Sequence, residues 1–233
     1  MSQNRYVEGH YEARNPRWHV EESPWKAEQI LRILRKHNRQ PRTICEVGCG
    51  AGEILSHLYN QLPSTVVLHG YDISPHAIEL CKKHQKPRLA FHLGDLLQEE
   101  VVRPFDLVLT IDVIEHVEDY FGFLRKLRPR GRQHVFHIPL EISVQTVLRC
   151  SPILRAREQV GHLHSFTKET ALATLADTGY EIVDYFYTAA SIEPPNRSVK
   201  QQIGKLPRRV AYRLNADWAV RILGGYSLLV LAQ

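Results

Sequence analysis

The sequence predicts an α/β fold: a doubly wound, mostly parallel sheet of seven strands with helices on both faces. Strand-like apolar segments alternate with helical ones along the 233 residues, which favours parallel pairing through crossover helices. The segment FDLVLTID at 105–112 is almost continuously apolar, as expected of a strand buried on both faces. A glycine-rich turn follows the first core strand, at the edge where open α/β sheets bind ligands.

The first half of the chain should open with a helix after about 20 polar and aromatic residues. Ser23 suits its N-cap and Pro24 its first position, and the apolar residues from Ala27 to Leu34 share one face. Pro41 ends this region. The predicted elements that follow are a strand at 42–47, a helix from about 51, a strand at 65–72, a helix at about 74–84 and a strand at 88–95.

The second half continues the alternation up to a last pair of strands. After the strand at 105–112, the predicted elements are a helix at about 119–128, a strand at 132–139, a helix after Thr167 that stops at Gly179, and strands at 180–189 and 226–233. The segment 140–165 fits no strand, and 193–213 is an excursion rich in basic residues.

Composition and length indicate one sizeable domain with attachments. The chain is 43% hydrophobic and 24% charged, ordinary values that exclude a disordered or fibrous class. No apolar run is long enough to span a membrane, and the N-terminus lacks the apolar core of a signal peptide, so we expect a cytoplasmic protein. The spacing of Cys45, Cys49, Cys81 and Cys150 fits neither a zinc ribbon nor a disulfide framework and indicates reduced thiols.

The turn ICEVGCGAGE at 44–53 places an acid two residues before three alternating glycines. Glycines at this density imply a close approach between backbone and ligand. The pattern differs from the dinucleotide fingerprint G-x-G-x-x-G, and Glu46 would repel a pyrophosphate. The next strands also end in acids, at Asp72, Asp95 and Asp112. These acids predict a ligand with an amine, a ribose and an adenine-like ring.

Together these residues resemble the class I S-adenosylmethionine-dependent methyltransferases, which have a Rossmann-like fold. EVGCGAG matches the first motif of that family, YDIS its ribose acid and GDLL its adenine acid, while FDLVLTIDVIEHVED matches its fourth-strand motif. The last match is to a subgroup with D-x-x-E-H after the fourth strand, similar to ubiquinone-biosynthesis-type and natural-product O-methyltransferases. The motifs cover about 42–140, and LHSFTKETALATLADTGYEIV continues the subgroup pattern.

The resemblance implies that S-adenosylmethionine is the cofactor and S-adenosylhomocysteine the product. The glycines would lie against the methionine part of the cofactor, Asp72 would bind the ribose, and Asp95 with the Leu96 amide would contact the adenine. Glu46 would order the turn, and Asp112 would lie near the methionine end. The cofactor-binding residues carried over are Glu46, Gly48, Cys49, Gly50, Gly52, Asp72, Ile73, Asp95, Leu96 and Asp112.

Four histidines fall near the predicted carboxyl edge of the sheet, where the acceptor should lie. They are His116, His137, His162 and His164, and any of them could serve as a general base. We therefore expect methyl transfer to a small-molecule acceptor, more probable at oxygen than at nitrogen. Because a histidine titrates near neutral pH, it suits removal of a hydroxyl proton.

A metal-dependent reaction is the alternative. Asp112, Glu115 and His116 resemble the E-x-x-E-H arrangement of metal-dependent O-methyltransferases, and a divalent ion there would lower the pKa of an acceptor hydroxyl. The first position is Asp here, and the same D-x-x-E-H string occurs in relatives with no known metal requirement. A metal is therefore not favoured.

The chain divides into a helical lid or cap at 1–40 and a methyltransferase domain at 41–233, with acceptor-side insertions at about 140–165 and 190–215. Aromatic faces suit a sulfonium cation, and the segment before the first strand contains Tyr6, Tyr11, Trp18 and Trp25. We expect this segment to fold over the cofactor.

Three other functions stay open. A net charge of +5 permits an RNA methyltransferase that uses the basic C-terminal region, but DVIE replaces the [DN]-P-P-[FYW] motif, and EPPN at 193–196 lies too late in the chain. Leu206, Val210 and Leu214, with basic neighbours, would favour a membrane surface. A non-catalytic binding protein is the third. The sequence indicates no obligate protein partner.

Overall fold

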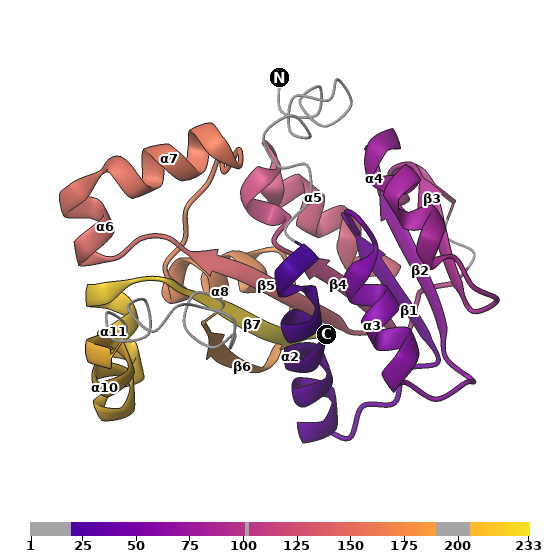
Figure 1. The fold of residues 1–233 in the computed structure, drawn as a ribbon, viewed down its shortest axis with the longest axis horizontal. Helices are drawn as coiled ribbons and strands as arrows, with labels where there is room; N and C mark the ends of the chain where they lie inside the picture. The colour runs from indigo at the N-terminus through magenta and orange to yellow at the C-terminus, as the bar shows by residue number, and fades with distance from the viewer. Residues whose placement is uncertain (1–19, 101–102, 190–205) are drawn as a thin grey trace.

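The computed structural model describes residues 20–100, 103–189 and 206–233 (Figure 1). These residues form a seven-stranded sheet of order β3-β2-β1-β4-β5-β7-β6, in which only β7 runs antiparallel to its neighbours. The strands are β1 Thr43–Val47, β2 Val67–Asp72, β3 Leu89–Leu93, β4 Leu107–Ile111, β5 His134–Leu140, β6 Ile182–Thr188 and β7 Tyr226–Ala232. The predicted doubly wound, mostly parallel α/β fold is confirmed.

Helices cover both faces of this sheet (Figure 1). They are α2 Ser23–Lys36, α3 Glu53–Gln61, α4 Pro75–Cys81, α5 Tyr120–Leu127, α6 Val144–Arg149, α7 Ser151–Gln159, α8 Lys168–Asp177, α10 Leu206–Leu214 and α11 Ala216–Leu223. Short 3-10 turns are η1 Val20–Glu22, η2 Lys82–His84, η3 Leu96–Gln98, η4 Ile114–His116 and η5 Arg128–Arg130.

Two hydrophobic cores lie on opposite faces of the sheet, and neighbouring strand residues alternate between them. In β4, Leu107 and Leu109 enter the core built with α2 and α3, whereas Val108 enters the core built with α5 and α8. Every residue of β4 is buried. This burial on both faces explains why the segment is almost continuously apolar.

The structure corrects the predicted start of α2 and shows helices in the segment 140–165. Pro24 does lie in the first turn of α2, but the prediction that Ser23 is the N-cap was wrong. The turn η1 runs directly into the helix, so Ser23 is already helical and buried, and Glu22 takes the N-cap position. The segment 140–165, which fitted no strand, contains α6 and α7.

The strand order reverses between β1 and β4, which places a ligand crevice at the carboxyl ends of these strands. Because β7 is antiparallel to β5 and β6, its first residue lies at the same edge as their last residues. The helices inserted before α8 and before β7 therefore both lie at the carboxyl edge. Among the described residues, no helix is long and apolar enough to cross a membrane.

Candidate active site

A cavity of about 990 Å³ opens at the carboxyl ends of β1, β2, β4 and β5. All but one of the predicted cofactor residues line it: Glu46, Gly48, Cys49, Gly50, Asp72, Ile73, Asp95, Leu96 and Asp112. The exception is Gly52, which is the N-cap of α3 with a left-handed φ of 76°. A Cβ at Gly52 would lie 2.6 Å from the Phe91 ring, so this glycine serves helix packing.

The turn after β1 is held by backbone hydrogen bonds to β2. The amides of Gly48 and Cys49 both donate to the Tyr71 carbonyl, at 2.8 and 3.1 Å. Gly48 has a φ of 72°, and a Cβ there would lie 2.7 Å from a methyl group of Val113. Glycine is therefore required at this position by both conformation and space.

Asp72 connects this turn to the start of α4. Its carboxylate accepts from the Gly50 amide and from the Ser74 amide, each at 2.9 Å. Burial raises the pKa of Asp72 to about 6, although these backbone amides favour the ionised form. On the next strand, Asp95 accepts from the Leu97 amide at 2.9 Å and caps η3.

Lys26 on α2 is a cavity residue that the sequence patterns did not identify. Its ammonium donates to Asp112 at 2.7 Å and lies 3.7 Å from Glu22. Burial lowers the pKa of Lys26, but Asp112 more than reverses this effect, so the pKa lies above its usual value. Burial raises the pKa of Glu46 well above its usual range, and the positive charge of Lys26 opposes this effect only in part.

Asp112 follows β4 with a left-handed φ of 54° and is held from two sides. His137 Nδ1–H donates to Asp112 Oδ1 at 2.5 Å, and His137 Nε2 lies 2.8 Å from the Thr188 hydroxyl. Burial by itself would raise the pKa of Asp112, but His137 and Lys26 hold it well below its usual range. Because the carboxylate already has two charged or polar partners, the backbone strain at Asp112 is compensated.

Glu115, His116 and His162 form a cluster in the wall of the cavity. One ligand atom from each lies within 4.8 Å of the others. Glu115 is fully buried, and neither carboxylate oxygen has a hydrogen-bond partner among the residues that the structure describes. Burial and the Asp112 charge raise the pKa of Glu115 well above its usual value.

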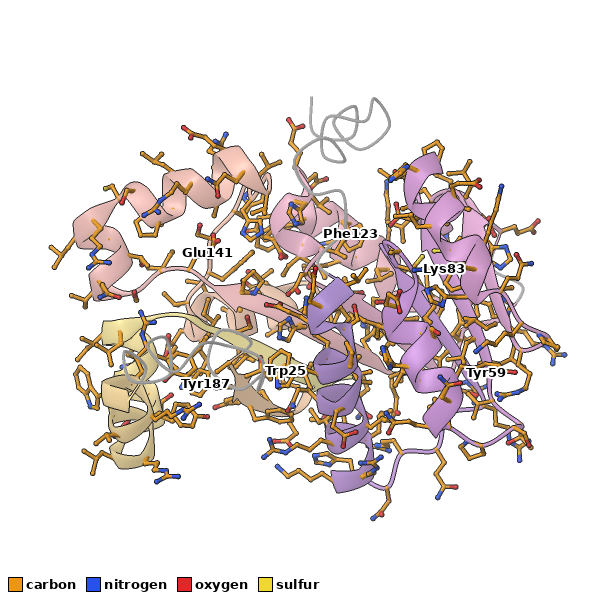
Figure 2. All side chains as sticks on the ribbon, viewed as in Figure 1. Trp25, Tyr59, Lys83, Phe123, Glu141 and Tyr187 are labelled. Atoms are coloured by element: carbon orange, nitrogen blue, oxygen red, sulfur yellow. The ribbon has the colours of Figure 1, made fainter. Side chains whose placement is uncertain are left out.

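The two histidines of this cluster differ in their partners. His116 Nδ1–H donates to the Gly161 carbonyl at 3.2 Å, and burial lowers the pKa of His116 to about 4, so the ring is neutral at pH 7. His162 Nδ1 lies 2.6 Å from Glu141 Oε1, while Glu141 Oε2 accepts from the Ser165 hydroxyl at 2.8 Å. Glu141, labelled in Figure 2, lies between β5 and α6, and its contact with Nδ1 orients His162.

A family model described as methyltransferase domain matches residues 18–185 of this chain. The chain belongs to the methyltransferase domain family. The ubiquinone biosynthesis O-methyltransferase of Schizosaccharomyces pombe is 35% identical over 114 residues, which cover 44% of this chain and 40% of that protein. The norajmaline N-methyltransferase of Rauvolfia serpentina is 30% identical over 44% of this chain and 36% of its own length. The matched segments thus span less than half of these relatives.

Solved methyltransferases have the same fold at low sequence identity. The magnesium protoporphyrin IX methyltransferase of Synechocystis PCC 6803 with bound SAH superposes with a TM-score of 0.59 at 18% identity, over 90% of this chain and 82% of that one. The N-methyltransferase NodS of Bradyrhizobium japonicum WM9 gives 0.59 at 18% identity, over 99% and 95% of the two chains. The family match and the sequence relatives, together with this shared fold, confirm the class I S-adenosylmethionine-dependent methyltransferase assignment.

This methyltransferase domain brings three of the four predicted histidines to the cavity. His116, His137 and His162 line it. His164 is not among the described lining residues, because its ring packs on Tyr120 and its Nε2 lies 3.2 Å from the Glu118 carbonyl. The sequence pattern placed His164 two residues from His162 but could not show that the chain turns it away.

The alternative metal set also changes. Asp112 is paired with Lys26 and His137, so the candidate ligands are Glu115, His116 and His162 instead of Asp112, Glu115 and His116. The string D-x-x-E-H supplies two of the three ligands, and the third comes from a loop 46 residues beyond His116. Of the predicted lid, Trp25 is on α2 (Figure 2), and its ring lies edge-on to His137. Tyr6, Tyr11 and Trp18 lie outside the described residues.

Proposed function

We propose that this protein transfers the methyl group of S-adenosylmethionine to a hydroxyl of a small-molecule acceptor. The observation that carries the proposal is a single cavity lined both by the glycine turn, which we call the cofactor end, and by the Glu115–His116–His162 cluster, which we call the acceptor end. Its volume of about 990 Å³ is at the upper end of small-ligand sites, which suits a cofactor and an acceptor together.

The cofactor end fits the parts of S-adenosylmethionine in turn. Asp72 and Asp95 would accept from the ribose hydroxyls and the adenine amine, while Gly48 and Gly50 leave room for the methionine chain. Lys26, which lines the cavity and pairs with Asp112, would attract the methionine carboxylate. Its loss would weaken cofactor binding more than acceptor binding.

Methyl transfer is an in-line displacement. The acceptor oxygen forms a bond to the methyl carbon as the carbon–sulfur bond breaks, and the electron pair stays on the sulfur of S-adenosylhomocysteine. Because the sulfonium is already a good leaving group, positioning supplies much of the acceleration, with effective molarities of about 10⁵ M or more. The acceptor proton still has to move to a base.

His162 is the best candidate for that base. Glu141 fixes one ring nitrogen of His162, which leaves Nε2 to take the proton and stabilises the imidazolium that forms. His137 has Asp112 and Thr188 on its two nitrogens, and burial lowers the pKa of His116 to about 4, so both suit the role less well.

The experiment is a labelling of host extract. Purified protein is incubated with methyl-labelled S-adenosylmethionine and extract, and small metabolites are then separated from RNA and protein. Label in the small fraction, on an oxygen of the isolated product, supports the proposal. Label on nitrogen would keep the enzyme class and change the acceptor group, and label in RNA or protein would overturn the small-molecule assignment.

A second candidate mechanism uses a divalent metal at Glu115, His116 and His162. The donor set fits, since Glu115, whose carboxylate oxygens have no partner among the described residues, the neutral His116, and His162, which is backed by Glu141, place one ligand atom each within 4.8 Å of one another. A bound ion would supply Lewis-acid activation of the acceptor hydroxyl. Calorimetric titration with Mg²⁺, Mn²⁺ and Zn²⁺ against Glu115→Gln tests it, and turnover unchanged by exhaustive chelation would dispose of it.

A further inference from the structure

Four helices at the carboxyl edge of the sheet have an unusual surface. Of the eleven strongly exposed large apolar residues in the described part of the chain, eight lie in α6, α7, α10 and α11. They are Val144, Val147, Leu148, Leu154, Val210, Leu214, Trp218 and Ile222. No residue of α6 or α7, both fully described, is buried. We call these eight residues and the arginines of the same helices the insertion face.

The apolar residues of this face form stripes along their helices. Val144 and Leu148 are four residues apart, as are Val210 and Leu214, and Trp218 and Ile222. Side chains at this spacing lie on one side of a helix. Leu148 and Leu214 are each 82% exposed and Trp218 is 60% exposed, so the stripes are turned away from the domain.

The helices pack on one another as a unit beside the cavity. Arg208 of α10 donates to Gln145 of α6 and to the Leu223 carbonyl of α11, both at 3.1 Å. In Figure 1, α6 and α7 lie above the left end of the sheet and α10 and α11 below it. Val160, directly after α7, and His162 line the cavity. The insertion face thus adjoins the acceptor end.

The charge of these helices is strongly one-sided. They contain seven arginines, no lysine and only two acidic residues, Glu158 and Asp217. This surplus of five equals the net charge of the entire chain, so the remaining residues are balanced. At the border with α8, the ammonium of Lys168 pairs with Asp217 at 2.6 Å, and Arg221 pairs with Glu169.

We propose that the insertion face docks on an anionic lipid bilayer. Exposed leucine, valine and tryptophan side chains on short basic helices are suited to the boundary between headgroups and acyl chains. Arginines beside them would contact lipid phosphates. A second copy of the chain fits less well as the partner. If two copies paired through this face, two surfaces with five surplus positive charges each would meet and repel one another. An RNA would leave the apolar stripes without a partner.

The test is co-sedimentation of the full chain with vesicles. One set contains phosphatidylcholine alone and the other phosphatidylcholine and phosphatidylglycerol in equal parts. We expect binding to the second set, weakened by salt, and little binding to the first. Binding to neither set would overturn the proposal, as would RNA binding that competes with the vesicles and is insensitive to the apolar variants.

Matched variants locate the contact. Leu148→Glu combined with Leu214→Glu should lose binding at least tenfold, since both side chains are almost fully exposed and their replacement leaves the core intact. Arg149→Gln and Arg213→Gln should each weaken binding about fivefold, which corresponds to about 1 kcal/mol for each charge. Leu93→Glu, at a 56% exposed position on β3, is the control and should bind as the parent does.

Two further measurements distinguish a loss of membrane binding from a loss of folding and from dimer formation. Binding of S-adenosylhomocysteine by each variant reports whether the domain is folded, independently of vesicles and of any acceptor. Light scattering after size exclusion reports the oligomeric state. A dimer that Leu148→Glu dissociates would assign the insertion face to a second copy and overturn the membrane proposal, whereas a monomer that binds anionic vesicles through Leu148 and Leu214 would support it.

Discussion

The two halves of the cavity are built in different ways. At the cofactor end, backbone amides satisfy two of the acids: Asp72 accepts from Gly50 and Ser74, and Asp95 accepts from Leu97, whereas one oxygen of the buried Glu46 has no partner among the described residues. At the acceptor end, Glu115 is buried with both oxygens unpartnered among the described residues. The first arrangement stabilises the fold without a ligand, while the second costs stability and makes sense if a ligand completes it.

This difference indicates which part of the cavity tolerates changes in sequence. The cofactor end belongs to short connections between adjacent strands, so a shift of one residue would break several hydrogen bonds at once. The acceptor end takes His162 and Glu141 from the segment around α6 and α7, helices with no buried residues of their own among those described. A family can therefore exchange acceptor segments while it keeps one cofactor site.

Loss of the proposed base should have the largest effect on turnover. We expect His162→Ala to lower kcat about 10²–10⁴-fold, the usual contribution of general base catalysis, without changing affinity for S-adenosylhomocysteine. Glu141→Gln should lower kcat less, because the amide oxygen can still accept from Nδ1 and hold the ring in place, while the negative charge beside the ring is lost. His164→Ala, outside the cavity, is the control. Equal losses in His162 and His164 variants would contradict the assignment.

At the cofactor end, Gly48→Ala should cause the next largest loss. A Cβ there meets Val113 at 2.7 Å, and the left-handed backbone adds about 1–2 kcal/mol of strain. We expect cofactor affinity to fall about tenfold or more, measured by calorimetry with S-adenosylhomocysteine. The double variant Gly48→Ala, Val113→Ala removes the clash but not the strain. Full recovery in that variant would show that backbone conformation contributes nothing.

Sequence reasoning reached the fold and the cofactor end because their signals are local. Gly48, Asp72 and Asp95 lie at the ends of β1, β2 and β3 or within two residues of them, so the order of strands alone brings them to one edge. Lys26 was missed because its contact with Asp112 depends on how the start of α2 packs beside the residues after β4, which no spacing encodes.

The acceptor end was predicted only as a set of candidates. Asp112 stands at the first position of D-x-x-E-H, and this motif does not reveal whether its carboxylate is available to a metal. The structure shows that the carboxylate is paired with Lys26 and His137. His162 and His164 are equivalent in the string GHLHSF. Their difference arises from long-range packing, since the Glu115 carbonyl accepts from the amides of Leu163 and His164 and thereby fixes the turn.

Glu115→Gln should separate stability from function at the acceptor end. Burial raises the folded-state pKa of Glu115 above its unfolded value, so its protonated form stabilises the fold at low pH and this contribution is lost as pH rises through the folded-state pKa. The variant should match the parent near about pH 4 and exceed it at alkaline pH by about 1 kcal/mol or more in free energy of unfolding. Urea titrations over this range measure it. A variant less stable than the parent at every pH would contradict this account.

The smallest effect on stability is expected at the insertion face. Leu148→Ala should change the free energy of unfolding by less than about 0.5 kcal/mol, because the side chain is 82% exposed and has little packing to lose. Leu55→Ala in α3, where the leucine is fully buried, should cost about 2–5 kcal/mol in the same titration. A large cost at Leu148 would mean that this side chain is covered in solution by the chain itself or by a second copy. Because a bilayer is absent from the titration, a cost near zero is the result that an unoccupied docking surface requires.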